Sequence, residues 1–258
     1  MAARSAQATR PPAGTLLDLR VDDLAQGGAG IARHNGYVVF VEGGLPGDLV
    51  RAEVVKAKRD YARARVADLI EPSSERVAER CEHDGLPCPG SPWQALRYER
   101  QLEHKQRQVD EALSRLGGLS GYELEPIIPA VEIWRYRNKL EYSFGEKKGP
   151  SAGKPAAGFV EGGRDEGSLV LGFHQRGHWE QIVDAHDCML ASERNNAVRN
   201  LVRDWFSTQD SSAYDRRTGQ GFLRNLVVRE GQRTGALQVR LVTAAGDLAS
   251  GTLAAALA

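Results

Sequence analysis

The sequence is poor in cysteine, has no long apolar run and carries no excess charge of either sign. Three cysteines in 258 residues argue against a disulfide-stabilised secreted domain and predict a reducing, cytoplasmic location. No run approaches the roughly 18 apolar residues of a membrane span. Residues 1–13 contain two arginines but no apolar signal core, so we expect a disordered tail there. Lysine plus arginine and aspartate plus glutamate both number 34, so any charged surface must be local.

A glycine-rich nucleotide-binding loop is also missing. Residues 27–30 read Gly-Gly-Ala-Gly, but Arg33 stands where the last glycine of G-x-G-x-x-G would fall, and no Gly-Lys-Ser/Thr follows. No helical pattern succeeds the run either. A bend or bulge in a strand is therefore the better interpretation of these glycines.

Residues 14–72 have the pattern of a small β-barrel. Leu17, Leu19 and Val21 alternate with polar residues, and similar patterns recur over residues 37–41, 48–56 and 61–70. The pair Asn35-Gly36 favours a two-residue hairpin turn, because both positions of such a turn need positive φ. Five or so short strands over this length predict a closed barrel of the OB type.

One edge of this barrel is basic. Residues 51–65 contain six cations and two acids, with Tyr61 among them. This composition suits a phosphate backbone with a stacked base, and the expected RNA-binding residues here are Lys56, Lys58, Arg59, Arg63 and Arg65. A solvated strand edge that its charges protect from aggregation is the alternative interpretation.

Residues 73–120 combine a cysteine loop with a predicted helix. Cys81 and Cys88 lie on a Gly- and Pro-rich loop, and Cys188 follows far along the chain in a His-Asp-Cys triplet. Thiolates on a tight loop can converge on zinc or an iron–sulfur cluster, so the three sulfurs could join two distant segments; three unrelated free thiols are the alternative.

The helix is expected to begin directly after the cysteine loop. Ser91 would be its N-cap, Pro92 its first residue and Gln94 the partner in a capping box. Apolar residues at helical spacing predict a buried stripe, and two glycines end the helix; these residues are Leu96, Leu102, Val109, Leu113, Leu116, Gly117 and Gly118.

Residues 121–247 are predicted to form a central α+β domain. A strand over residues 134–144 interleaves aromatic rings with Arg135, Arg137, Asn138 and Lys139, as single-stranded RNA binding requires. An ordinary amphipathic strand is the alternative. A flexible loop is expected over residues 145–168 and a hairpin over residues 169–183. A helix over residues 191–206, two further strands within residues 222–243 and the start of a helix over residues 248–258 are expected to follow.

Taken in order, these features resemble one family. The most specific matching segments are Cys81 to Gly90, Trp93-Gln94, Tyr136 to Lys139, Gly172 to His174, Cys188 and Leu223 to Leu226. They are similar to the N-terminal and central parts of the SAM-dependent RNA uracil-C5 methyltransferases of tRNA and 23S rRNA, which begin with a TRAM domain. The resemblance implies an α+β fold with a TRAM barrel, an iron–sulfur-type loop, a helix and a central domain. It also implies RNA as partner, with rRNA favoured over tRNA, and Arg224 as a further RNA contact.

By the same resemblance, Cys81, Cys88 and Cys188 would ligate a [4Fe–4S] cluster. The sequence departs from the family at the third ligand position, where Ser91 stands. Three arrangements follow: a three-cysteine cluster with an open iron, a Cys₃His zinc site using His83 or His186, or no metal.

The resemblance also defines the chemistry. Methylation of uracil C5 needs a nucleophile that adds at C6, methyl transfer from SAM, and a base that removes the C5 proton. The sequence offers no Gly-rich strand-to-helix turn for SAM, and its cysteines fall at cluster positions. We therefore expect SAM only in the full-length family, the Rossmann-like C-terminal domain to be absent, and a truncated, inactive RNA-recognition chain. A stand-alone RNA-binding module or a zinc-stabilised structural protein is the alternative.

Overall fold

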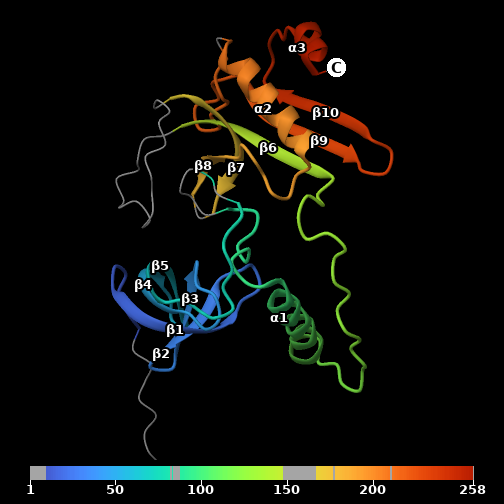
Figure 1. The fold of residues 1–258 in the computed structure, drawn as a ribbon. Coiled ribbons are helices and arrows are strands. Elements are labelled where there is room, and N and C mark those ends of the chain that lie inside the picture. Colours follow the sequence, from blue (N-terminus) through green and yellow to red (C-terminus); the bar gives the residue numbers. More distant parts are fainter. Residues whose placement is uncertain are drawn as a thin grey trace, which may run out of the picture. The chain divides into compact units, whose positions relative to one another are not determined.

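The computed structural model describes residues 10–81, 83, 88–147, 167–176, 178–209 and 211–257, which fall into two compact units (Figure 1). Unit 1 comprises Met1–Glu79 and Ser91–Pro129, and unit 2 comprises Arg80–Gly90 and Ala130–Ala258. Most of the tail expected over residues 1–13, and residues 148–166 of the loop expected over residues 145–168, lie outside the described residues.

Unit 1 contains a closed five-stranded barrel with strand order β1-β2-β3-β5-β4. The parallel pairing of β3 with β5 and the antiparallel pairing of β1 with β4 complete the ring. Small and β-branched side chains on the inward face fill it, among them Ala32, Val39 and Val50, which are fully buried. The strands are β1 (Leu16–Leu24), β2 (Gly30–His34), β3 (Tyr37–Glu42), β4 (Leu49–Ala57) and β5 (Tyr61–Glu71).

Two local sequence signals fall at turns of the barrel. Asn35 and Gly36 have φ of 48° and 81° and connect β2 to β3, as the hairpin signal predicts. Gly27 and Gly28 lie in the turn between β1 and β2, so the predicted bend or bulge within a strand is wrong, and a Cβ on Gly30 would lie 2.7 Å from the carbonyl oxygen of Gly44. These glycines therefore allow close backbone approach and do not form a phosphate loop.

The helix of unit 1 begins later than its capping signals predict. Helix α1 spans Tyr98–Glu111, its N-cap is Arg97, and a π-helical turn, Ala112–Leu116, continues it. Residues 91–97 instead run beside residues 75–77, where the N–H of Val77 donates to Ala95 and the N–H of Arg97 donates to Glu75. Tertiary pairing of this segment, with Leu96 buried, outweighs the local capping signal, so the predicted start at Ser91 is wrong.

The apolar stripe predicted for this helix is only partly buried. Val109 is 49% exposed and Leu116 is 88% exposed. His104 is the buried residue of α1, and its Nδ1 lies 3.1 Å from Asp23 Oδ1 on the barrel. The helix therefore contacts the barrel through polar groups that the apolar spacing does not indicate.

Unit 2 contains a five-stranded sheet of order β10-β9-β6-β7-β8, in which all neighbours are antiparallel. Helix α2 (Glu193–Ser207) packs its apolar residues into the core of this sheet, together with Leu253 of α3 (Ser250–Leu257) (Figure 1). The strands are β6 (Lys139–Glu146), β7 (Leu169–Gln175), β8 (His178–Asp184), β9 (Leu223–Gly231) and β10 (Ala236–Thr243). The strand predicted from residue 134 thus begins at Lys139.

A buried ion pair joins helix α2 to this sheet. Arg199 is fully buried and pairs with Asp184, whose side chain is 4% exposed; Arg203 and His186 also contact that carboxylate, at 3.4 and 3.0 Å. The Nε of Arg199 donates to the carbonyl oxygen of Leu171 at 2.8 Å. The buried face of α2 is therefore partly polar, since Asn195, Asn196 and Arg199 are buried with its apolar residues.

None of the helices in the described ranges has the length and apolar content that a membrane crossing requires.

Candidate metal centre and nucleic-acid interface

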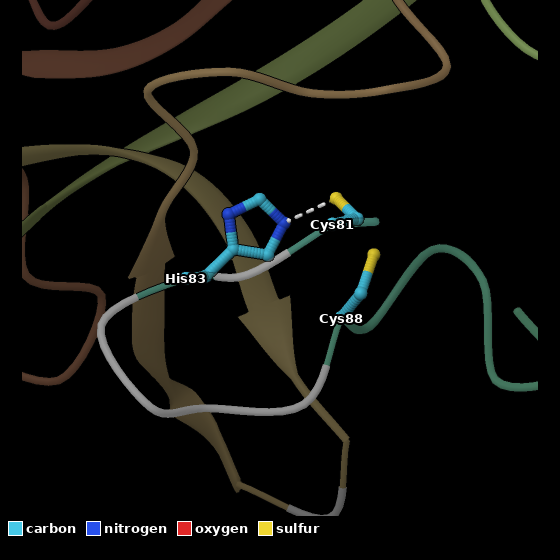
Figure 2. A group of neighbouring side chains, drawn as sticks. All are labelled: Cys81, His83 and Cys88. Carbon is cyan, nitrogen blue, oxygen red and sulfur yellow. Dashed lines mark hydrogen bonds between the residues drawn. The ribbon is translucent and has the colours of Figure 1, made fainter. Parts of the chain in front are cut away.

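The three cysteines are all free and all buried, and they lie in unit 2. Figure 2 shows the imidazole of His83 directed at the sulfur of Cys81, with Cys88 alongside. Cys81 Sγ lies 3.0 Å from His83 Nε2, and the donor atoms of Cys81, His83 and Cys88 all lie within 4.8 Å of one another. Two soft sulfur donors and one imidazole thus converge, which is the chemistry of a zinc or iron–sulfur ligand set.

Cys188 lies in a turn that is fixed by polar side chains. Its N–H donates to Oδ1 of Asn196 at 3.1 Å, and Nδ2 of Asn196 donates to Asp187 at 2.8 Å. The guanidinium of Arg135 donates to Asp187 at 2.8 Å and to the Cys188 carbonyl oxygen at 3.2 Å. These contacts fix the backbone of the turn that carries the Cys188 thiol.

Backbone N–H groups surround the sulfurs. Met189 donates to Cys81, Gly90 donates to Cys88, and Leu190 and Ala191 donate to Cys188. Hydrogen bonds of this kind stabilise negatively charged sulfur, as in metal-bound thiolates. The backbone around the three sulfurs is therefore arranged for thiolates.

The thiols also influence one another. A hydrogen bond from Cys81 lowers the pKa of Cys88 to about 4, and the same bond together with burial raises the pKa of Cys81. Burial raises the pKa of Cys188, and its charge interacts with that of Cys88.

Of the two histidines that the sequence offers as a fourth ligand, the structure brings His83 to the sulfurs. His186 lies 3.0 Å from the buried carboxylate of Asp184, in the ion-pair cluster at the end of β8. Asn196, which orients the Cys188 turn, was missed from the sequence. The signal for it was a polar pair, Asn195-Asn196, in the first turn of a helix, where side chains can bind a neighbouring loop.

The basic barrel edge gathers part of the expected set around one ring. Lys56, Lys58 and Arg63 line a shallow hollow with Tyr61, and Lys58 Nζ lies 5.9 Å from the centre of that ring. Phe40 supports Tyr61 edge to face at 5.4 Å. The two remaining cations are engaged by acids: Arg59 lies 3.7 Å from Asp60, and Arg65 lies 3.9 Å from Glu53.

The residues expected to bind RNA in the central domain have differing surroundings. Arg135 is committed to the Cys188 turn, and Lys139 forms an ion pair with Glu141 at 2.9 Å. Arg224 lies over the ring of Tyr214 at 4.5 Å. Arg137 and Asn138 are hydrogen-bonded through their backbones. The Arg137 N–H donates to the carbonyl oxygen of Leu190 at 3.0 Å, and the carbonyl oxygen of Asn138 accepts from the Glu230 N–H at 2.8 Å.

Comparison with known proteins first identifies the barrel. Residues 13–67 match the TRAM domain model, which covers all five strands except the end of β5.

The same comparison identifies relatives of the longer chain. It is 34% identical over 234 residues to an uncharacterised RNA methyltransferase of Halalkalibacterium halodurans, aligning 90% of this chain with 46% of the relative. It is 33% identical to an uncharacterised RNA methyltransferase of Synechocystis, aligning 90% of this chain with 46% of that protein. The chain therefore carries a TRAM domain and is homologous to RNA methyltransferases along nine tenths of its length.

A solved structure has the same fold. The Pyrococcus abyssi tRNA (uracil-54, C5)-methyltransferase, determined with S-adenosyl-L-homocysteine, superposes with a TM-score of 0.60 at 23% identity, covering 91% of this chain and 48% of that enzyme. The chain spans about half the length of the relatives that it matches.

These comparisons correct two expectations. The predicted absence of a methyltransferase domain from the protein, and the predicted inactivity of a truncated recognition chain, are wrong, because the chain aligns with RNA methyltransferases along 90% of its length and with a methyltransferase fold along 91%. The alternatives of an RNA-binding or zinc-stabilised module without methyltransferase activity are set aside for the same reason.

Proposed function

We propose that this protein is a SAM-dependent RNA uracil-C5 methyltransferase and that the described residues bind its substrate RNA. The observation that carries the proposal is the alignment of nine tenths of the chain with RNA methyltransferases. The fold shared with a uracil-C5 methyltransferase supports the choice of base, and the basic hollow of the TRAM barrel supports RNA as the partner. A cytoplasmic location agrees with this role.

The proposal is tested with full-length protein, SAM and transcripts that contain tritium at C5 of uridine. Methylation at C5 replaces that hydrogen, so tritium release that depends on SAM is expected. The sequence resemblance favours 23S rRNA over tRNA, and matched transcripts of both decide between them. Release from neither substrate, with RNA bound, would overturn the proposed activity.

The barrel hollow is proposed to hold the RNA backbone. Lys56, Lys58 and Arg63 supply three positive charges, and the hollow that they line contains no acidic residue. Tyr61 offers a ring on which a base can stack, because its edge rests on Phe40. Phosphate neutralisation of this kind depends strongly on salt.

Replacing Lys56, Lys58 and Arg63 together by glutamine is expected to weaken RNA binding at low salt by about tenfold or more. The plot of log affinity against log salt should lose a slope of roughly 0.7 for each charge removed. Fluorescence anisotropy of labelled RNA over a salt series measures both quantities. Arg20→Gln is the matched control, because Arg20 already pairs with Glu71 at 2.7 Å; equal slopes for the triple variant and wild type would contradict the assignment.

We also propose that Cys81, His83, Cys88 and Cys188 hold one metal ion, with zinc the best match. A tetrahedral zinc site with Zn–S near 2.3 Å and Zn–N near 2.0 Å places neighbouring donors roughly 3.5–3.8 Å apart. The donor atoms of Cys81, His83 and Cys88, all within 4.8 Å of one another, suit such an ion, whereas thiolates on separate irons of a [4Fe–4S] cluster lie farther apart. Cys188 lies outside that spacing, and its interaction with the charge of Cys88 supports it as the fourth ligand. The backbone hydrogen bonds to the sulfurs fit either group, so iron with acid-labile sulfide is the competing result.

Arg135, expected from the sequence to bind RNA, is proposed to position the Cys188 turn. Arg135→Ala is expected to speed metal release to a chromogenic chelator several-fold while leaving the salt dependence of RNA binding unchanged. Its guanidinium contacts Asp187 and the carbonyl oxygens of Cys188 and Ala191, so its loss frees the turn. Arg240→Ala, an exposed change on β10, is the control; a reduced RNA salt slope with normal metal retention would restore the RNA-binding role.

A further inference from the structure

A hollow on unit 2 is not used by the metal centre or by the barrel. The space within it, open solvent included, is about 830 Å³, and strands β6 to β9 and the segment 213–217 line it. Trp179, which is 56% exposed, lies on one side. Tyr214 lies in the wall with the guanidinium of Arg224 stacked 4.5 Å from its ring centre. The hollow thus presents planar groups that solvent can reach.

Polar groups in the wall have defined orientations. His174 Nδ1 contacts the carbonyl oxygen of Trp179, so Nδ1 carries the proton and Nε2 accepts from the hydroxyl of Ser143 at 3.1 Å. Ser143 Oγ in turn accepts from Nδ2 of Asn225 at 3.1 Å. In the described part of the chain, Oδ1 of Asn225 has no hydrogen-bond partner, which leaves an acceptor for a ligand.

The segment that carries Tyr214 is held tightly. The Tyr214 N–H donates to the carbonyl oxygen of Leu223 at 2.8 Å, and the Asp215 N–H donates to that of Gln220 at 2.8 Å. Gly221 has φ of 96°, and a Cβ there would lie 2.1 Å from the carbonyl oxygen of Ala213. The ring is therefore placed by the backbone before any ligand arrives.

The charge of the hollow differs from that of the barrel edge. Its lining contains three cations and three acids, which are Arg216, Arg217, Arg224, Glu146, Glu180 and Asp215. A balanced set does not select phosphate. The exposed ring of Trp179, the half-buried ring of Tyr214 with its stacked guanidinium, and a free amide acceptor suit a planar heterocycle with hydrogen-bond donors on its edge.

We infer that this hollow binds one unstacked nucleobase of single-stranded RNA, with the base against Trp179 or the Tyr214–Arg224 pair and its edge at Asn225. The inference rests on the proposed function, since it assumes an RNA substrate. It adds a base-reading site to the phosphate contacts of the barrel, and the two sites respond differently to salt.

The test uses a labelled single-stranded RNA of about 12 nucleotides and the variants Trp179→Ala and Tyr214→Ala. The variant that removes the stacking ring is expected to weaken binding about tenfold, the usual effect of losing one base–aromatic stack, with no change in salt slope. Trp179→Phe and Tyr214→Phe keep a ring and are expected to bind nearly as wild type. Replacing the nucleotide that enters the hollow by an abasic residue should weaken binding by the wild-type protein. The same replacement should leave binding unchanged in the alanine variant that lacks the stacking ring.

The outcomes separate this inference from the proposed function. If wild-type protein binds no RNA, the proposed function itself fails. If wild-type protein binds RNA and the alanine variants, confirmed as folded by circular dichroism, bind equally well, the base site alone is overturned. A loss of salt slope in those variants would also overturn it, since that result indicates phosphate contact.

Discussion

Cys88→Ala is expected to reduce bound metal from about one equivalent to a small fraction, because it removes one of four proposed ligands and the one whose thiolate form is most favoured. Cys88 accepts hydrogen bonds from Cys81 and from the Gly90 N–H, so its removal takes the sulfur best prepared for a metal. Structural zinc in small domains binds with about 10–16 kcal/mol, and part of this energy stabilises the fold. Elemental analysis and thermal unfolding with and without chelator measure both effects.

His83→Ala and Ser91→Ala separate two models of the fourth ligand. If His83 completes the site, His83→Ala loses most of the metal and Ser91→Ala retains it. Ser91 stands where the resembling family has a cysteine, so the reverse result would give the ligand role to the hydroxyl. Iron with acid-labile sulfide in wild-type protein would refute the single-ion model, and metal-free wild-type protein purified without chelator would refute any metal role.

Arg199→Ala is expected to lower the free energy of unfolding of unit 2 by about 3–5 kcal/mol, the usual cost of removing one partner from a buried ion pair. Arg199 is fully buried, and its guanidinium reaches both the Asp184 carboxylate and the carbonyl oxygen of Leu171. Without it, the carboxylate retains Arg203 and His186 but loses its closest partner. Urea unfolding followed by circular dichroism measures the change.

Two further variants make that result interpretable. Arg240→Ala removes an exposed cation from the same sheet and is expected to change stability by less than about 0.5 kcal/mol. The pair Arg199→Leu with Asp184→Leu removes both charges and is expected to be more stable than Arg199→Ala alone, because no buried charge is then left uncompensated. A loss below about 1 kcal/mol for Arg199→Ala would show that Arg203 and His186 suffice.

The barrel could be predicted from the sequence because its signals are local. Alternation with period two and an Asn-Gly pair depend only on neighbouring residues, and both agree with the strands and the turn found. The start of α1 could not be predicted, since Ser91, Pro92 and Gln94 imitate a helix start while residues 91–97 pair with a segment that precedes the cysteine loop. Capping patterns do not report such tertiary competition.

The candidate site was predictable in its residue types but less so in its geometry. The spacing of Cys81 and Cys88 suggested a ligand loop, but only the structure selects His83 over His186. The sequence predicts Arg135 to be a surface cation that binds RNA. In the structure its backbone has a positive φ of 57°, and its guanidinium donates to three acceptors in the turn that carries Cys188. Trp179 and Tyr214 line one hollow because of the order of the strands in the sheet, which their spacing in the sequence does not reveal.

The path of the chain between its two units has a practical consequence for dissecting the protein. Because Arg80–Gly90 is a short excursion from unit 1 into unit 2, the polypeptide changes unit three times. A protease that cuts once near residue 129 would leave Cys81, His83 and Cys88 covalently attached to the barrel and Cys188 on the other piece. Neither unit can be obtained by simple shortening of the gene, and limited proteolysis would yield two pieces that share one set of proposed ligands.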